Sequence, residues 1–388
     1  MLKRFSVSNY RCFRDAVEMV FDNIGTYNYN EECILNGLLG KAIIYGRNAT
    51  GKTNLGKAVS DIRYILYGNY NGYESTLNAN SDKDESSFCY EFQFGSKEVV
   101  YEYAKDRSGE LVHERLEIEG STMYSLSLED AKFEQVDLEL AGTETIQTDR
   151  YIESLKSSSK LLGMRFDNNM NRIPFLRYIL SNTALDGASV LRQLESYVLR
   201  MRLLSVQDVI QNAGRATSRN RSSFVEYLNE SDNLERFESF LNQMGVPCKL
   251  KIIERDNMGF LYFDLDKPIR FFTTASSGTL ALTSFYQNFM AYDFEPSFLY
   301  MDEFDAFYHY EMSESLVRYI IKSYPNTQVV FTTHNTNLMT NQLMRPDCLL
   351  ILSRDGRITA LRDATGRELR EGHNLEKLYI AGEFEQYE

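Results

Sequence analysis

Apolar positions recur with period two along residues 2–21 and again along residues 88–119. Because successive side chains of a strand point to opposite faces of its sheet, this pattern predicts strands with one buried face. In the second range, Gly95-Ser96 separates two alternating runs, which is typical of a hairpin. We therefore expect antiparallel strands that flank the rest of the fold.

Continuous apolar runs at residues 41–45, 297–301 and 328–331 follow a different pattern. Strands that are covered on both faces, as in parallel sheets, have such sequences. A helical pattern follows the first run as far as about Tyr67, and another separates the second run from the third. The order strand, helix, strand predicts a right-handed β-α-β unit with parallel strands.

The middle of the chain changes character, because apolar residues fall at helical spacing from about residue 151 to 245. Strand patterns resume at residues 249–265. A hairpin signal at Arg354-Asp355-Gly356 precedes a short helix expected within residues 374–384. Residues 121–150 are polar and acidic and predict no definite element.

These patterns together predict an α/β fold with a mixed sheet, an antiparallel part and an inserted helical part. We expect residues 1–150 and 249–388 to form the two halves of one nucleotide-binding head. Residues 151–248 would form the helical insertion between them.

Composition narrows the function classes. The chain of 388 residues has a formal net charge of −13, which argues against a uniformly basic nucleic-acid binder but permits a local basic patch. Its five cysteines are scattered without a Cys-x-x-Cys pair, so they predict reduced thiols rather than a disulfide framework or a zinc site. Neither an apolar run of membrane-spanning length nor an apolar signal core is present, so we expect a cytoplasmic protein without membrane contact.

A candidate phosphate-binding loop lies between the first apolar run and its helix and consists of Gly46, Arg47, Asn48, Ala49, Thr50, Gly51, Lys52 and Thr53, followed by Asn54. It matches G-x-x-x-x-G-K-[ST], the motif that wraps the phosphates of a nucleotide. Lys52 would place a positive charge at the β- and γ-phosphates, and Thr53 would offer its hydroxyl to Mg²⁺. The strand before the loop and the helix after it are the context that this motif requires.

A pair of carboxylates, Asp302 and Glu303, ends the second apolar run, where open α/β sheets place their ligands. Beside a phosphate loop, Asp302 would hold Mg²⁺ and Glu303 would orient and deprotonate the attacking water. A surface carboxylate is the alternative for Glu303. His334 follows the third run at the same sheet edge, and either a contact to the γ-phosphate or a purely structural role fits it. Asp305 lies just beyond the pair and would bridge to a partner subunit.

A turn of small residues at Ser276, Ser277 and Gly278 precedes another helical run. The N–H groups at a helix start attract anions, so this turn is a second candidate phosphate contact. A simple helix N-cap is the alternative interpretation.

Arginines are frequent between residues 192 and 221, where Glu195 and Asp208 are the acidic residues. This local positive balance is a candidate contact for DNA, RNA or an acidic partner, and a solvated loop explains it equally well. The arginines are Arg192, Arg200, Arg202, Arg215, Arg219 and Arg221.

The order of these motifs resembles the ABC-class ATPase head that structural-maintenance-of-chromosomes and RecF-type proteins share. The opening residues Phe5–Phe13, with Asn-Tyr-Arg, are similar to the same group. Asp302–His309, Thr332–Asn337 and Gly372–Tyr379 resemble stand-alone bacterial AAA/ABC ATPases of abortive-infection and anti-phage systems.

This resemblance implies ATP and Mg²⁺ as cofactors and a homodimer, or a higher homo-oligomer, that sandwiches ATP between two heads. The Ser276–Gly278 turn of one head would meet the γ-phosphate held by Lys52 of the other. The sequence departs from the family pattern in having a single glycine after the serines. Gln93, the one candidate for the family's loop glutamine, falls in a strand pattern. No long heptad insert is present, so a chromosome-tethering role is not expected.

The leading hypothesis is therefore an ATP-hydrolysing switch that controls a separate nuclease or toxin in anti-phage defence. The alternative is a DNA-repair ATPase that binds DNA ends through the arginines of its middle part. A P-loop kinase or GTPase is disfavoured because the sequence has no Asn-Lys-x-Asp guanine reader.

Overall fold

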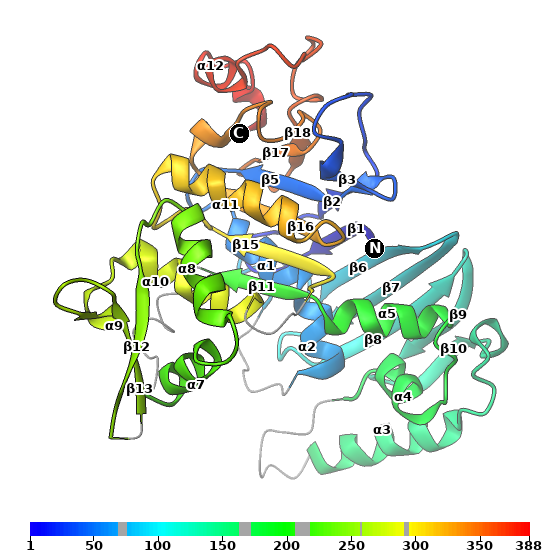
Figure 1. Ribbon diagram of the computed structural model, residues 1–388. Coiled ribbons are helices and arrows are strands. Elements are labelled where there is room, and N and C mark those ends of the chain that lie inside the picture. The colour runs from blue at the N-terminus through cyan, green and yellow to red at the C-terminus, as the bar shows by residue number, and fades with distance from the viewer. Residues whose placement is uncertain (69–75, 163–171, 206–217, 257, 291–294) are drawn as a thin grey trace.

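The computed structural model describes residues 1–68, 76–162, 172–205, 218–256, 258–290 and 295–388. Two large sheets organise the fold, and Figure 1 shows them next to each other with the N-terminus between them. The antiparallel sheet has the order β10-β9-β8-β7-β6-β1-β2. Its strands are β1 (Leu2–Ser8), β2 (Val17–Val20), β6 (Ser86–Phe94), β7 (Lys97–Lys105), β8 (Leu111–Ile118), β9 (Ser121–Ser127) and β10 (Lys132–Val136).

The second sheet, here called the core sheet, has the order β11-β15-β16-β5-β17-β18 and is parallel except for its last strand. Its strands are β5 (Lys41–Tyr45), β11 (Arg202–Ser205), β15 (Phe298–Asp302), β16 (Gln328–Thr333), β17 (Leu349–Leu352) and β18 (Ile358–Ala360). Every residue of β5, β15 and β16 is buried, which is why these strands are continuous apolar runs.

Smaller elements surround the two sheets. A three-stranded sheet consists of β12 (Leu250–Arg255), β13 (Met258–Phe263) and β14 (Ile269–Arg270), and a small hairpin of β3 (Ile34–Leu35) and β4 (Leu38–Leu39). The helices are α1 (Lys52–Val59), α2 (Asp61–Tyr67), α3 (Thr148–Leu162), α4 (Phe175–Asn182), α5 (Val190–Leu199), α7 (Ser218–Leu228), α8 (Asn233–Gln243), α9 (Phe271–Thr274), α10 (Ser277–Phe285), α11 (Tyr310–Ser323) and α12 (Leu375–Ile380). None of the described helices is long and apolar enough to cross a membrane.

Helix α1 is hydrogen-bonded to both sheets. The Tyr300 hydroxyl of β15 donates to the carbonyl oxygen of Lys52 at 2.7 Å, and the Tyr90 hydroxyl of β6 donates to that of Ala58 at 2.8 Å. Each hydroxyl is buried with its partner, so each bond resists displacement of the helix. The first and last turns of α1 are therefore fixed against different sheets.

Gln328, at the start of β16, joins the two sheets directly. Its side-chain oxygen accepts from the N–H of Leu2 at 2.8 Å and from the Tyr197 hydroxyl at 2.6 Å, and its amide donates to the carbonyl oxygen of Leu2 at 2.8 Å. All three residues are buried. This network sets β1 of the antiparallel sheet against the core sheet.

The structure differs from the sequence-based expectations in three places. The segment expected to be a helical insertion contains β11, an edge strand that pairs in parallel with β15. The helix expected to run to Tyr67 is interrupted at Ser60, where α1 ends and α2 begins. Residues 121–150, for which no element was predicted, contribute β9 and β10 to the antiparallel sheet.

Candidate functional site

The loop Gly46–Thr53 joins the end of β5 to the start of α1, as predicted. Gly51 has φ 104°, a left-handed conformation that favours glycine, and neighbouring side chains leave no room there for a Cβ. The Lys52 ammonium lies inside the loop and donates to the carbonyl oxygens of Gly46 at 2.7 Å and Arg47 at 3.1 Å. A positive charge and a helix N-terminus therefore occupy the same place, as phosphate binding requires.

Asp302 ends β15 beside this loop, although it lies 249 positions from Thr53 in the sequence. Thr53 Oγ1 donates to Asp302 Oδ2 at 2.6 Å. The carboxylate is 4 % exposed, so both of its oxygens depend on protein donors for hydrogen bonds. The structure thus brings together the two residues predicted to hold Mg²⁺.

Glu303 leaves the strand with φ 47°, a left-handed conformation that is uncommon outside glycine. Its N–H donates to Thr332 Oγ1 at 2.8 Å, and the same hydroxyl donates to Asp302 Oδ1 at 2.9 Å. Sequence reasoning missed Thr332. The available signal was a polar residue at the end of a fully buried strand.

Charge is unbalanced at this edge of the core sheet. Burial raises the pKa of Asp302, and the neighbouring Glu303 adds to this effect, while donation from Thr53 and Thr332 opposes it. Burial lowers the pKa of Lys52, whereas Glu303, Asp302 and Asp305 oppose that shift. The charges of these carboxylates and of the Lys52 ammonium thus influence one another at this end of the sheet.

His334 and Asp305 are placed differently from each other. His334 follows β16 at the same edge as Asp302, and its exposed side chain makes no hydrogen bond to the described residues. Asp305 is only 7 % exposed, and its Oδ2 accepts from Thr333 Oγ1 at 2.7 Å. Asp305 Oδ1 is buried and has no hydrogen-bond partner among the described residues, and the bridge to a partner subunit stays a prediction.

The turn at Ser276 starts helix α10 and caps it. Ser276 Oγ accepts from the N–H of Thr279 at 3.1 Å, as in the N-cap alternative. Ser276 and Ser277 are nevertheless exposed, whereas Gly278 is buried. A Cβ on Gly278 would lie 2.9 Å from the carbonyl oxygen of Phe307, so the turn packs closely on the loop that follows Asp302.

Gln93, the candidate for the family's loop glutamine, and Asn54, which follows the phosphate loop, form hydrogen bonds elsewhere. Gln93 lies in β6, where its amide donates to the carbonyl oxygens of Gly95 and Lys97 in the hairpin to β7. Asn54 Nδ2 donates to Cys12 Sγ at 3.0 Å. Gln93 is thus used in a turn of the antiparallel sheet and not at the phosphate loop.

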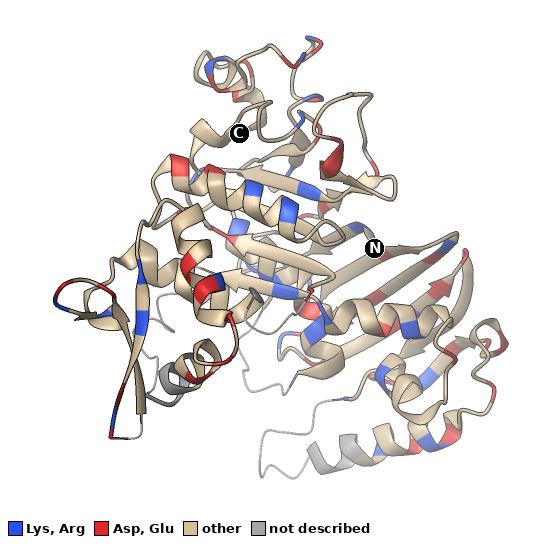
Figure 2. Cartoon of the chain, viewed as in Figure 1, with Lys and Arg blue, Asp and Glu red and all other residues tan. Residues whose placement is uncertain are grey.

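The arginine cluster is only partly described. Arg215 lies outside the described residues, as do the side chains of Arg219 and Arg221 on α7. Arg192 forms an ion pair with Glu195 on α5. Figure 2 shows acidic and basic positions interspersed along the antiparallel sheet and its helices.

A smaller positive group lies at the start of β11. Arg202 Nη1 and Arg63 Nε both donate to the carbonyl oxygen of Leu199, at 2.8 and 3.4 Å, and Arg200 is exposed beside them. Burial lowers the pKa of Arg202, and the charge of Arg63 adds to this effect. Arg63 was not among the predicted arginines, because it comes from α2, far away in the sequence.

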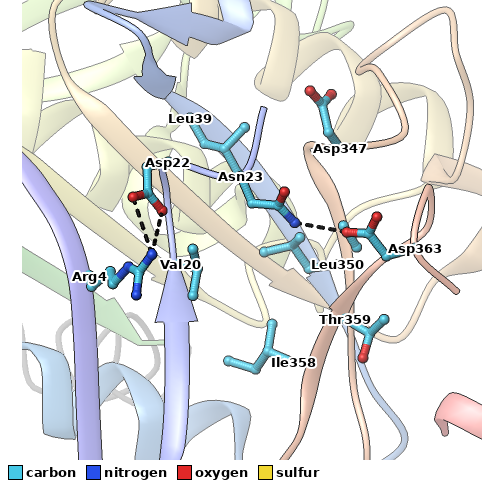
Figure 3. A pocket seen from close by; sticks show the side chains of 11 residues that line it. Arg4, Val20, Asp22, Asn23, Leu39, Asp347, Leu350, Ile358, Thr359 and Asp363 are labelled. Carbon is cyan, nitrogen blue, oxygen red and sulfur yellow. Dashed lines mark hydrogen bonds and ion pairs between the residues drawn. The ribbon is translucent and has the colours of Figure 1, made fainter. Parts of the chain in front are cut away.

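A cleft of about 390 Å³ lies away from the phosphate loop, between the sheet edges β2 and β18 (Figure 3). Its carboxylates have partners: Asp22 pairs with Arg4 at 3.3 Å, and Asp363 accepts from Asn23 Nδ2 at 2.8 Å. The cleft contains none of the predicted site residues. This cleft is therefore separate from the place where the phosphate loop meets Asp302.

Comparison with known families agrees with this geometry. A family model described as "AAA domain, putative AbiEii toxin, Type IV TA system" matches residues 41–340. That range contains the phosphate loop, the turn at Ser276 and the edge from Asp302 to His334. The chain belongs to this AAA-domain family. A search of curated sequences found no significant match to this AAA-domain protein.

Solved structures show the fold of the AAA-domain protein. An Smc head bound to the C-winged helix domain of ScpA has a TM-score of 0.51 and 13% identity, covering 93% of this chain and 97% of that one. An SMC head domain from Thermotoga maritima has a TM-score of 0.42 and 11% identity, covering 92% and 98%. An Smc head domain from Pyrococcus furiosus, bound to the C-terminal domain of ScpA, has a TM-score of 0.44 and 13% identity, covering 93% and 96%. The first of these confirms the predicted P-loop NTPase fold of ABC-head type.

Proposed function

We propose that this AAA-domain protein binds ATP with Mg²⁺ and hydrolyses it to ADP and phosphate. The observation that carries the proposal is the 2.6 Å contact between Thr53 Oγ1 and Asp302 Oδ2, which joins the phosphate loop to the acidic end of β15. Membership of the AAA-domain family and the ABC-type head fold support the same activity.

The residues at this contact suit Mg²⁺. This cation prefers oxygen ligands and uses one or two protein groups together with phosphates and water. Thr53 and Asp302 supply a hydroxyl and a carboxylate oxygen, and the described part of the chain contains no larger His, Cys, Asp or Glu cluster that could hold a metal alone. When bound, Mg²⁺ would neutralise charge that develops on the β- and γ-phosphates.

The chain's own residues account for the remaining steps. The Lys52 ammonium and the N–H groups at the start of α1 would hold the phosphates, because both place positive charge inside the loop. Glu303 would orient a water and accept its proton while the water oxygen bonds to the γ-phosphorus and the bond to ADP breaks. His334, exposed at the same edge, would contact the γ-phosphate or this water.

Hydrolysis would operate a switch between two copies of the chain. Ser276 and Ser277 are exposed at the start of α10, where N–H groups favour an anion. In a homodimer, this turn would cover the γ-phosphate held by Lys52 of the other copy. The close packing of Gly278 on the loop after Asp302 would link that contact to the site of hydrolysis in its own copy.

The output of the switch would be a separate nuclease or toxin in a bacterial anti-phage system of the abortive-infection type. The family description supports this direction because it names a toxin and a type IV toxin–antitoxin system. The similar Smc head is bound to a winged-helix domain of another protein, which supports a protein partner for a head of this fold.

ATP turnover by the purified chain tests the activity. We expect Lys52→Ala and Glu303→Gln each to lower the rate by about 100-fold or more, since each removes a group that acts on the transferring phosphoryl group. Lys57→Ala is the matched control, because Lys57 lies on the same helix and outside the loop. Turnover that survives in both site variants would refute the assignment.

A further inference from the structure

The Thr332 hydroxyl connects two residues whose functions differ. It donates to Asp302 Oδ1 at 2.9 Å and accepts from the N–H of Glu303 at 2.8 Å. Thr332 is fully buried, and it comes from β16 rather than from the strand that carries the two acidic residues. One side chain thus contacts both the candidate Mg²⁺ ligand and the backbone of the candidate base.

The Thr332 hydroxyl both donates and accepts a hydrogen bond at this site. A threonine hydroxyl has one proton to donate, and here it is directed to Asp302, while a lone pair receives the Glu303 N–H. The remaining carboxylate oxygen of Asp302 is held by Thr53. Both oxygens of this carboxylate therefore have fixed directions, one set by the phosphate loop and one by β16.

The backbone of Glu303 requires such support. Its φ of 47° is a left-handed conformation that a side chain with a Cβ avoids unless the surroundings impose it. Two hydrogen bonds hold the backbone of Glu303 at this turn: its N–H donates to Thr332 Oγ1 at 2.8 Å, and its carbonyl oxygen accepts from the N–H of Ala306 at 3.1 Å. The bond to Thr332 is the one of the two that comes from another strand, so its loss would loosen the turn and with it the direction of the Glu303 carboxylate.

We propose that Thr332 is a positioning residue for ATP hydrolysis, which fixes the turn at Glu303 and the orientation of Asp302 with a single hydroxyl. The proposal rests on the proposed ATPase function. It adds a residue that touches neither the nucleotide nor the water and whose effect is exerted through Glu303 and Asp302.

Thr332→Val tests this role, since valine keeps the shape of the side chain and removes both hydrogen bonds. We expect kcat to fall by about 10- to 100-fold, as for other residues that orient a catalytic group, while the KM for ATP changes by less than about threefold. Thr332→Ser restores the hydroxyl and should return kcat to within about threefold of wild type. Thr327→Val is the matched control, because Thr327 is equally buried, precedes the same strand and loses a hydrogen bond to Pro296 at the opposite sheet edge.

Several outcomes separate this proposal from its alternatives. Equal kcat in Thr332→Val and wild type would refute it and leave the ATPase proposal intact. Equal losses in the valine and serine variants would also refute it, because the hydroxyl would not be the cause. If Thr332→Val does not fold, Thr332→Ser still tests the proposal. A kcat of Thr332→Ser that is as low as that of Glu303→Gln would contradict it. A wild-type chain that does not hydrolyse ATP would refute both.

Discussion

Lys41 offers a quantitative test of how the core sheet is built. It is the first residue of β5 and is fully buried, with its ammonium donating to the carbonyl oxygen of Thr327 at 2.6 Å. Burial lowers its pKa from 10.5 to about 8, although the thiols of Cys33 and Cys348 act in the opposite direction. The folded chain therefore holds this proton less tightly than the unfolded chain does.

This pKa shift makes the free energy of unfolding depend on pH, and the linkage between proton binding and folding gives the sign and size of that dependence. Between pH 8 and 10.5 the unfolded state binds more protons at this residue, so its contribution to the free energy of unfolding rises with pH. A shift of one pKa unit corresponds to about 1.4 kcal/mol, and integration from pH 7 to pH 10 gives a gain of about 2.5 kcal/mol.

Urea unfolding of the wild type and of Lys41→Met at pH 7, 8, 9 and 10 measures this gain. Tyrosines and cysteines titrate in both proteins, so the difference between their free energies of unfolding isolates Lys41. We expect the wild type to gain about 2.5 kcal/mol relative to the variant over this range. A difference that is constant with pH, or that moves against the wild type, would refute a buried ammonium with a lowered pKa.

Three further outcomes are expected. Glu114→Gln should lower the free energy of unfolding, measured in urea, by about 2 to 4 kcal/mol. The reason is that this buried carboxylate accepts hydrogen bonds from two tyrosine hydroxyls and from two N–H groups at the start of α4. An unchanged urea midpoint would contradict this. Asp302→Asn should reduce turnover and require more Mg²⁺, and an unaltered Mg²⁺ titration would argue against its role as a ligand. If the arginines bind DNA, the affinity for DNA, measured by fluorescence anisotropy, should depend less steeply on salt concentration in the double variant Arg200→Ala, Arg202→Ala. The slope should fall by the equivalent of about two phosphate contacts, and Arg236→Ala is the control.

Much of the site was predictable because its strands are buried on both faces. Such strands are continuous apolar runs, so β5, β15 and β16 could be located from hydrophobicity alone. The parallel order of their ends then placed Gly46–Thr53, Asp302–Glu303 and His334 at one sheet edge. Their roles stay predictions, while the fold they imply is confirmed.

Other features depend on tertiary contacts that local patterns do not contain. β11 has only four residues, three of them half-buried, and it is a strand because β15 offers it an open edge. The function of Thr332 arises from hydrogen bonds to residues about thirty positions away, on another strand. Asp305 likewise accepts a hydrogen bond from Thr333, which lies on the same neighbouring strand.

The central claim is that ATP closes two copies of this chain and hydrolysis reopens them. Size-exclusion chromatography with light scattering tests it most directly. The Glu303→Gln variant is used because it should hydrolyse ATP slowly. The control is the double variant Glu303→Gln, Lys52→Ala, which should not bind ATP. We expect the molar mass of Glu303→Gln to double with ATP and Mg²⁺ but not with ADP, and the control to stay unchanged. A Glu303→Gln protein that binds ATP and keeps the same mass would contradict the switch.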